Sequence, residues 1–197
     1  MNIAHYFTFL RVFLIPFFPL VYLHREWFHL SFKAMPYVLI LILLICEASD
    51  VIDGVLARKR KIVSDLGKII DPMADVITHI SVFFTFTQGL VDAPLLIVFI
   101  LLYRELVISA LRTLCALKGV ALAAKKSGKI KAISQAVISF AIVIMLIPYS
   151  WGVISLEFLQ TASLILLSVA AIYSALSAVD YFYANRRYLK EVVKKQE

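Results

Sequence analysis

Residues 50–75 read DVIDGVLARKRKIVSDLGKIIDPMAD, which places two pairs of aspartates within or beside two apolar stretches. A helix turns by about 100° per residue, so the members of each pair, three or four residues apart, lie on one face of their helix. The sequence therefore predicts two helical faces that present paired carboxylates to each other. These residues are Asp50, Asp53, Asp71 and Asp75.

Charged side chains are costly at membrane depth, where each one costs roughly 2.5 to 3.5 kcal/mol on insertion scales. A single buried aspartate is explained by a helix-packing hydrogen bond or by an ion pair with arginine. Four in register need a compensating cation, and we interpret them as a metal site. Carboxylate oxygens without nearby His or Cys suit Mg²⁺ or Mn²⁺, and four of them have enough oxygens for two ions.

Three further residues of this stretch suit a phosphate-bearing ligand. Gly54 and Gly67 lie on the same helical faces as the aspartates and leave room for a close approach to the backbone. Arg58 carries a planar guanidinium that matches the geometry of a phosphate. The stretch therefore indicates a substrate that contains phosphate.

The composition is that of a membrane protein, because 62% of the 197 residues are hydrophobic and only 17% are charged. The connections are short and contain no linker or low-complexity tract. We predict a single all-α, polytopic membrane domain over residues 1–197, with six transmembrane helices. The expected spans are Phe7–Leu23, Ala34–Leu56, Leu66–Gln88, Pro94–Leu117, Ile130–Ser150 and Leu156–Tyr183.

Lysine and arginine are concentrated in alternate connections, which predicts orientation by the positive-inside rule. They fill residues 58–61, 118–131 and 186–195, whereas the third and fifth connections contain none. Both termini and the aspartates are therefore expected on the cytoplasmic side. Residues 1–6 suit an interfacial segment and residues 184–197 a cytoplasmic tail, and the basic ends favour contact with anionic membrane lipids.

Several other classes of function are disfavoured. The basic residues border membrane spans instead of forming a soluble face, so we expect no nucleic acid partner. The two cysteines are too few for a disulfide framework, and the four histidines lack the spacing of zinc ligands. The first apolar stretch contains Arg11 and is not followed by a small-residue cleavage pattern, so we expect a mature helix there.

The pattern D-x2-D-G-x2-A-R-x8-G-x3-D-x3-D between Asp50 and Asp75 resembles the signature of the CDP-alcohol phosphatidyltransferases at every fixed position. The opening is similar to the family's N-terminal motif at Asn2, Thr8 and Arg11. The resemblance implies six transmembrane helices around a polar cavity that faces the cytoplasm, usually in a homodimer. We expect the inner membrane of a bacterium as the location.

The same resemblance implies roles for individual residues. The four aspartates would ligate the metal ions, and Asp75 would also act as the general base. Ala4 and His5 replace a proline and an asparagine of the family, and this departure bears on the N-terminal contact to the nucleotide. The positions expected to hold the CDP-lipid are Thr8, Gly54, Ala57, Arg58, Ser64 and Gly67.

The acceptor is predicted from the second half of the chain. Arg104 and Arg112 are about 80° apart on one predicted helix, so one cavity can receive both. Buried guanidiniums are costly unless an anion binds there, and Lys129 and Lys131 begin the next span nearby. We predict that these four residues bind a phosphate on the acceptor. The alternative is that Arg112 pairs with Glu105 and that the lysines anchor helix ends at the interface.

The stretches Arg104–Arg112, Lys118–Val120 and Gly128–Lys131 resemble the phosphatidylglycerophosphate synthase branch of the family. That branch transfers the phosphatidyl group of CDP-diacylglycerol to sn-glycerol 3-phosphate and releases CMP. Val76 and Ala132 stand where the branch usually has lysine and threonine. Two alternatives remain: a cardiolipin synthase of the same family, which would use phosphatidylglycerol, and a divalent-cation transporter, since intramembrane acids also mark ion pathways.

Overall fold

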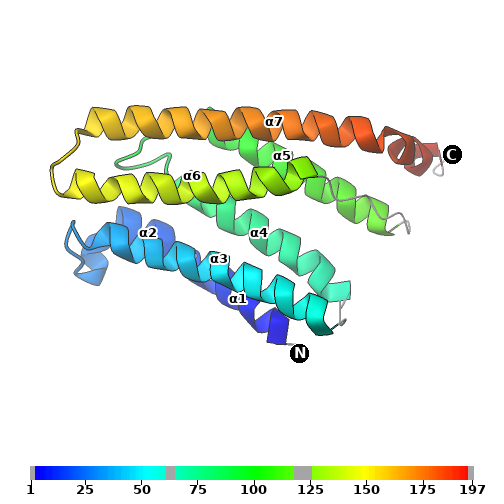
Figure 1. Ribbon diagram of the computed structural model, residues 1–197, viewed down its shortest axis with the longest axis horizontal. Helices are drawn as coiled ribbons and strands as arrows, with labels where there is room; N and C mark the ends of the chain where they lie inside the picture. Colours follow the sequence, from blue (N-terminus) through cyan, green and yellow to red (C-terminus); the bar gives the residue numbers. More distant parts are fainter. Residues whose placement is uncertain (1–2, 61–64, 118–125, 195–197) are drawn as a thin grey trace.

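The computed structural model describes residues 3–60, 65–117 and 126–194; within them, side chains are described except at 3–7, 53–60, 65–72, 112–114, 116–117, 126–127 and 187–194. Every regular element of the described residues is a helix (Figure 1). In chain order these are α1 (Ile3–Leu14), α2 (Phe17–Leu23), the 3-10 helix η1 (Arg25–Phe28), α3 (Met35–Arg60), α4 (Asp65–Thr85), α5 (Leu95–Leu117), α6 (Lys126–Ser150) and α7 (Leu156–Lys194).

A helix lies at the position of each predicted span, and the first of them is broken. Pro16 follows the end of α1 and has no N–H for a helical hydrogen bond. The chain bridges the break with bonds from Ile15 N to Arg11 O and from Phe18 N to Ile15 O, each 3.0 Å long. The predicted span Phe7–Leu23 is therefore one kinked rod made of α1 and α2.

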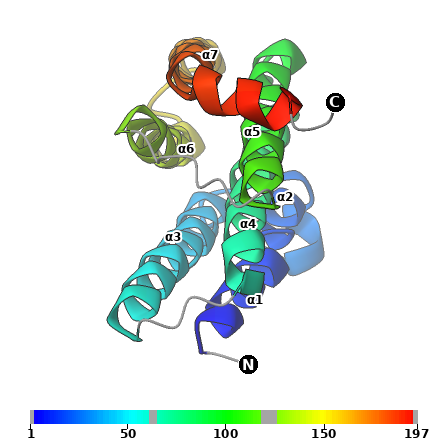
Figure 2. The same ribbon diagram turned by 90° about the vertical axis from the view of Figure 1, so that its right-hand side faces the viewer.

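The six rods form a closed ring when their contacts are followed from neighbour to neighbour. The order is α1, α3, α6, α7, α5, α4 and back to α1, and α4 also contacts α6 across the ring (Figure 2). Helix α2 packs on both α3 and α4. Because of this order, α3 and α4, which carry the aspartate pairs, are both held by the rod of α1 and α2.

Successive rods run in opposite directions. Both termini therefore lie in the same half of the molecule, together with the end of α3 and the start of α4 (Figure 1). The α4–α5 and α6–α7 turns lie at the opposite end. The ends of α3, α5 and α7 and the start of α6, which border the predicted basic connections and tail, thus lie at one end of the bundle, as an even number of antiparallel rods requires.

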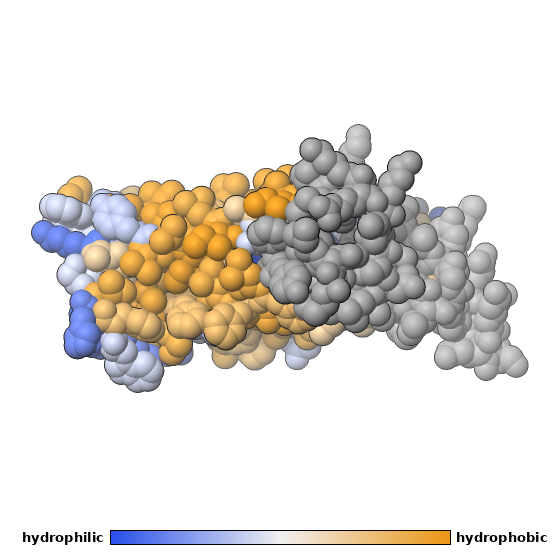
Figure 3. All heavy atoms as spheres, turned by 90° about the horizontal axis from the view of Figure 1, so that it is seen from below, coloured by the Kyte–Doolittle hydropathy of each residue, from blue (hydrophilic) through white to orange (hydrophobic). Residues whose placement is uncertain are grey.

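Helix length and composition support a membrane protein. Within the described residues, three helices contain segments long and apolar enough to cross a membrane: Met35–Ile52, Gly128–Ser150 and Leu156–Arg186. Shorter apolar helical segments cover Thr8–Leu23 and Met73–Thr85. In the coloured part of Figure 3, apolar residues form a broad surface band that is bordered at one end by hydrophilic residues. Such continuous exposed apolar surface is unusual in a soluble monomer.

The end opposite the termini is held by aromatic packing. Phe86 lies edge-on to the rings of Phe18 and Tyr22, with centroid distances of 6.0 and 6.2 Å. The Tyr22 hydroxyl accepts a hydrogen bond of 2.9 Å from the backbone N–H of Val91. Gly89 has a φ of 70°, and a Cβ there would lie 3.1 Å from the Tyr22 ring. Glycine therefore fits both the backbone conformation and the contact of this turn with α2.

Candidate active site

The structure describes the side chains of one aspartate from each predicted pair. Asp50 lies on α3 and is 49% exposed, and Asp75 lies on α4 and is 37% exposed. Both carboxylates are therefore partly accessible to a ligand. Asp53 and Asp71 belong to the same two helices, but their side chains lie outside the described ones.

Asp50 is joined to the first helix by a buried arginine. Arg11 Nη1 donates to Asp50 Oδ1 over 2.5 Å, and the Arg11 side chain is only 3% exposed. The neighbouring Arg11 Nε is buried without a hydrogen-bond partner among the described residues. The N-terminal helix thus brings a buried cation to Asp50, and the Nε of this arginine is a further hydrogen-bond donor.

Asp75 contacts a histidine on its own helix. His79 Nε2 lies 3.2 Å from Asp75 Oδ1, and the His79 side chain is 8% exposed. The sequence disfavours zinc binding by this histidine and predicts no other role for it. The signal for the contact was its spacing, since residues four apart lie on the same face of a helix.

A fifth acid, which is not among the predicted site residues, lies near the aspartates. Glu47 is partly buried on α3, one turn before Asp50. It is close enough for the charges of Asp50, Asp75, His79 and Arg11 to act on it. The spacing of three residues between Glu47 and Asp50 would have placed both acids on one helix face.

Two of the predicted acceptor residues, Arg104 and Lys131, contact the same acid, Glu105. Arg104 Nη1 lies 3.1 Å from Glu105 Oε2, and Arg104 Nη2 donates to Ser177 Oγ over 2.9 Å. Lys131 Nζ donates to Glu105 Oε1. Glu105 therefore holds cations from both α5 and α6, and α7 supplies a further contact through Ser177.

The remaining acceptor residues are placed less completely. Lys129 is exposed near the start of α6. Arg112 belongs to α5, but its side chain lies outside the described ones, so the alternative Arg112–Glu105 pair has no described geometry. Arg104 Nε is buried without a hydrogen-bond partner among the described residues, so this donor is unpaired there.

The acidic and basic groups are electrostatically connected. Lys131 and Arg11 both lie close enough for their charges to act on Asp75, and Arg104 acts on Lys131 in turn. We call this set the polar layer. Its members are Arg11, Glu47, Asp50, Asp75, His79, Arg104, Glu105, Lys131 and Ser177. Each of the six rods contributes at least one of them.

The expected CDP-lipid residues are described only in part. Thr8 is buried on α1, one turn before Arg11. Ser64 lies outside the described residues. Gly54, Ala57 and Arg58 belong to α3 and Gly67 to α4, with side-chain positions outside the described ones.

The donor chemistry of the acids fits a hard divalent cation. Asp50 on α3 and Asp75 on α4 supply carboxylate oxygens, the ligand type that Mg²⁺ and Mn²⁺ prefer. Among the described side chains, no three acids, histidines or cysteines converge on a common metal position. The other two predicted ligands are Asp53 and Asp71, whose side chains are not among those described.

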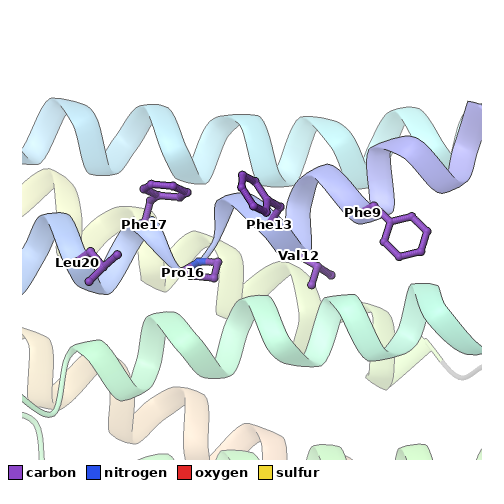
Figure 4. Close-up of a pocket in the computed structure, with 6 residues that line it drawn as sticks. All are labelled: Phe9, Val12, Phe13, Pro16, Phe17 and Leu20. Carbon is purple, nitrogen blue, oxygen red and sulfur yellow. The ribbon is translucent and has the colours of Figure 1, made fainter.

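An apolar groove on the N-terminal rod is chemically different from the polar layer. Aromatic, aliphatic and proline side chains line it along α1 and α2, around the break at Pro16 (Figure 4). Its lining contains no titratable group, so it supplies no group for acid–base chemistry. The lining residues are Phe9, Val12, Phe13, Pro16, Phe17 and Leu20.

The described residues form only helices, several of them apolar, and partly buried acids lie on α3 and α4. This architecture is typical of a membrane protein. The model of the CDP-alcohol phosphatidyltransferase family matches residues 1–179, so the chain belongs to this family. Family members are transferases that in general use divalent metal ions. The predicted family is thereby confirmed.

Two relatives are both named CDP-diacylglycerol–glycerol-3-phosphate 3-phosphatidyltransferase. The Bacillus subtilis protein is 29% identical over 96% of this chain and 97% of its own length. The Haemophilus influenzae protein is 31% identical over 91% of both chains. The similarity thus extends over nearly the whole chain and includes both the aspartate stretch and the acceptor stretch.

Proposed function

We propose that this protein transfers the phosphatidyl group of CDP-diacylglycerol to sn-glycerol 3-phosphate, which yields phosphatidylglycerol phosphate and CMP. The observation that carries the proposal is the similarity, over nearly the whole chain, to relatives named for this reaction. The polar layer supports it, because carboxylates and buried cations meet there in one helical ring.

Asp75 is the proposed general base. Its carboxylate would take the proton from the acceptor hydroxyl while that oxygen forms a bond to the β-phosphorus of CDP-diacylglycerol. The bond from this phosphorus to the bridging oxygen breaks, and CMP leaves with the electron pair. The partial exposure of Asp75 supports this role, since a substrate must reach the carboxylate.

Asp50, Asp53, Asp71 and Asp75 are the proposed ligands of two Mg²⁺ or Mn²⁺ ions. Bound ions would neutralise negative charge that develops on the pyrophosphate. Arg11 holds Asp50 from α1, so the first helix would orient this ligand. Thr8, Gly54, Ala57, Arg58, Ser64 and Gly67 are the proposed contacts to the CDP-lipid.

The proposed acceptor site consists of Arg104, Arg112, Lys129 and Lys131. Glu105 balances part of the positive charge in the absence of substrate, since it contacts both Arg104 and Lys131. Arg104 retains its buried Nε donor for a phosphate oxygen. The phosphate monoester of glycerol 3-phosphate carries more negative charge than the phosphodiester of phosphatidylglycerol, so these cations favour glycerol 3-phosphate as the acceptor.

The proposed topology is a single six-span domain, with both termini and the polar cavity on the cytoplasmic side of the bacterial inner membrane. In this arrangement residues 1–6 lie in the interface, and residues 184–197 form the tail. Reporter fusions after Glu197 and within residues 151–153 test the sidedness, because the proposal requires opposite locations for them. The homodimer is tested by light scattering of the detergent-purified protein.

CMP release tests the reaction. Detergent-purified protein receives CDP-diacylglycerol and Mg²⁺ or Mn²⁺, with glycerol 3-phosphate, phosphatidylglycerol or no acceptor in parallel. The proposal predicts release that requires glycerol 3-phosphate. Release with phosphatidylglycerol alone would instead indicate the cardiolipin synthase reaction, and no release from folded protein would contradict the enzyme class.

A further inference from the structure

His79 contacts the proposed general base, yet the roles above give it no function. Its Nε2 lies 3.2 Å from Asp75 Oδ1. The imidazole is almost completely buried, whereas the carboxylate that it contacts is partly exposed. The histidine therefore approaches Asp75 from the protein interior and leaves the accessible side of the carboxylate open to ligands.

This contact constrains the carboxylate without requiring a charged histidine. A neutral imidazole that carries its proton on Nε2 donates a hydrogen bond to Oδ1. A bond to one oxygen limits rotation of the carboxylate and leaves the other oxygen for a substrate hydroxyl or a cation. Carboxylates that bind metals are commonly oriented by such hydrogen bonds, and loss of the partner typically costs about 10- to 100-fold in affinity or activity.

The surroundings explain why Asp75 needs a fixed orientation. Lys131 and Arg11 both attract its carboxylate from other helices. Glu47, on α3, repels the Asp75 carboxylate. Without the bond to His79, the carboxylate is free to turn toward one of the two cations, which would remove it from the position required for proton transfer.

We propose that His79 is a positioning residue that holds the Asp75 carboxylate in the orientation used for metal binding and for proton removal. This inference rests on the proposed role of Asp75. It adds a requirement that the aspartate signature does not contain, namely a hydrogen-bond donor one helical turn after the last aspartate.

The test compares variants of the full-length protein in detergent. His79→Leu removes the donor, His79→Gln keeps an amide N–H at a similar reach, and His79→Asn carries the same amide on a shorter side chain. Thr78→Val is the matched control, since Thr78 is also buried, and its hydroxyl donates to the carbonyl of Ala74 over 2.9 Å. Mn²⁺ affinity is measured by electron paramagnetic resonance without substrate, and kcat and KM are measured by CMP release.

The expected result is a loss of Mn²⁺ affinity of about 10- to 100-fold in His79→Leu and His79→Asn. We also expect a lower kcat with little change in the KM for glycerol 3-phosphate. His79→Gln should recover most of both losses, and Thr78→Val should match the unaltered protein. The Gln and Asn variants differ by one methylene and preserve polarity, so their comparison decides the question even if His79→Leu does not fold.

Unaltered Mn²⁺ affinity in His79→Asn would overturn the inference, and so would a His79→Gln variant that binds Mn²⁺ as weakly as His79→Asn. Absence of Mn²⁺ binding in the unaltered protein would overturn it as well. A failure of the proposed reaction is distinguishable, because it would appear as absent CMP release in the unaltered protein, while the Mn²⁺ measurements would still decide the role of His79.

Discussion

The two ends of the helical ring bury different kinds of side chain. At the end of the α4–α5 turn, the buried groups include Phe18, Phe83 and Phe86. Toward the end with the termini, they include Arg11 and Lys131, which contact acids on other helices. Apolar packing holds the rods together whichever ligand is bound. A buried ion pair instead depends on both partners, because removal of one of them costs about 3 to 5 kcal/mol of stability. We infer that one end provides stability and the other provides chemistry.

The largest expected effect is a lower kcat, caused by a substitution at the polar end. Asp75→Asn retains the shape of the side chain and removes the proposed base, so we expect kcat to fall by about 10²- to 10⁴-fold. Binding of CDP-diacylglycerol should persist in part, as measured with labelled lipid. Full activity in a correctly folded Asp75→Asn protein would exclude Asp75 as the base.

A smaller effect is expected for the acceptor. Lys131→Met removes a charged hydrogen-bond donor, and charged hydrogen bonds contribute about 1.5 to 3 kcal/mol. We therefore expect the KM for glycerol 3-phosphate to rise about 10- to 100-fold, with an unchanged KM for CDP-diacylglycerol as the internal control. An equal rise in both constants would indicate a general disturbance of the polar layer and not an acceptor site.

At the apolar end, a substitution should change stability and leave substrate affinity unchanged. Phe86→Ala removes a fully buried ring, and such changes cost about 3 to 5 kcal/mol. The midpoint of thermal unfolding in detergent should fall by about 2 to 4 °C for each kcal/mol. Phe13→Ala is the control, because Phe13 is 73% exposed. A large change in either KM of Phe86→Ala would contradict the separation of the two ends.

The smallest expected effect concerns a contact at the surface of the apolar end. Lys33 Nζ lies 4.1 Å from the centroid of the Trp151 ring and links the chain before α3 to the α6–α7 turn. Exposed cation–π contacts contribute about 0.5 to 1 kcal/mol. Lys33→Gln should therefore lower the unfolding midpoint by at most a few degrees, without a change in kcat. A loss of activity in this variant would show that the apolar end affects the chemistry at the polar end.

The sequence predicted the positions of the rods because long apolar stretches and their charged borders are local features. The kink at Pro16 was also local, but it was not predicted, since the hydropathy of Phe7–Leu23 continues across it. The proline dictates the break by its missing N–H. Hydropathy alone therefore predicted the extent of the first rod but not its division into two helices.

The contacts between residues of the candidate site were harder to predict than the residues themselves. Asp50 and Asp75 follow from the signature, but the partner of Asp50 is 39 residues earlier, on α1. Likewise, Lys131 reaches Glu105 from a helix that starts beyond the next connection. These pairs depend on the order of the rods in the ring, which helical periodicity does not contain. The Asp75–His79 contact was available from spacing alone.

Identification of the lipid product tests the central claim most directly. The unaltered protein receives CDP-diacylglycerol and isotopically labelled glycerol 3-phosphate, and the lipid fraction is analysed by mass spectrometry alongside CMP. The account predicts labelled phosphatidylglycerol phosphate in an amount equal to the CMP released. CMP release with the label remaining entirely in the aqueous fraction would contradict it, because the acceptor would then not have entered the lipid.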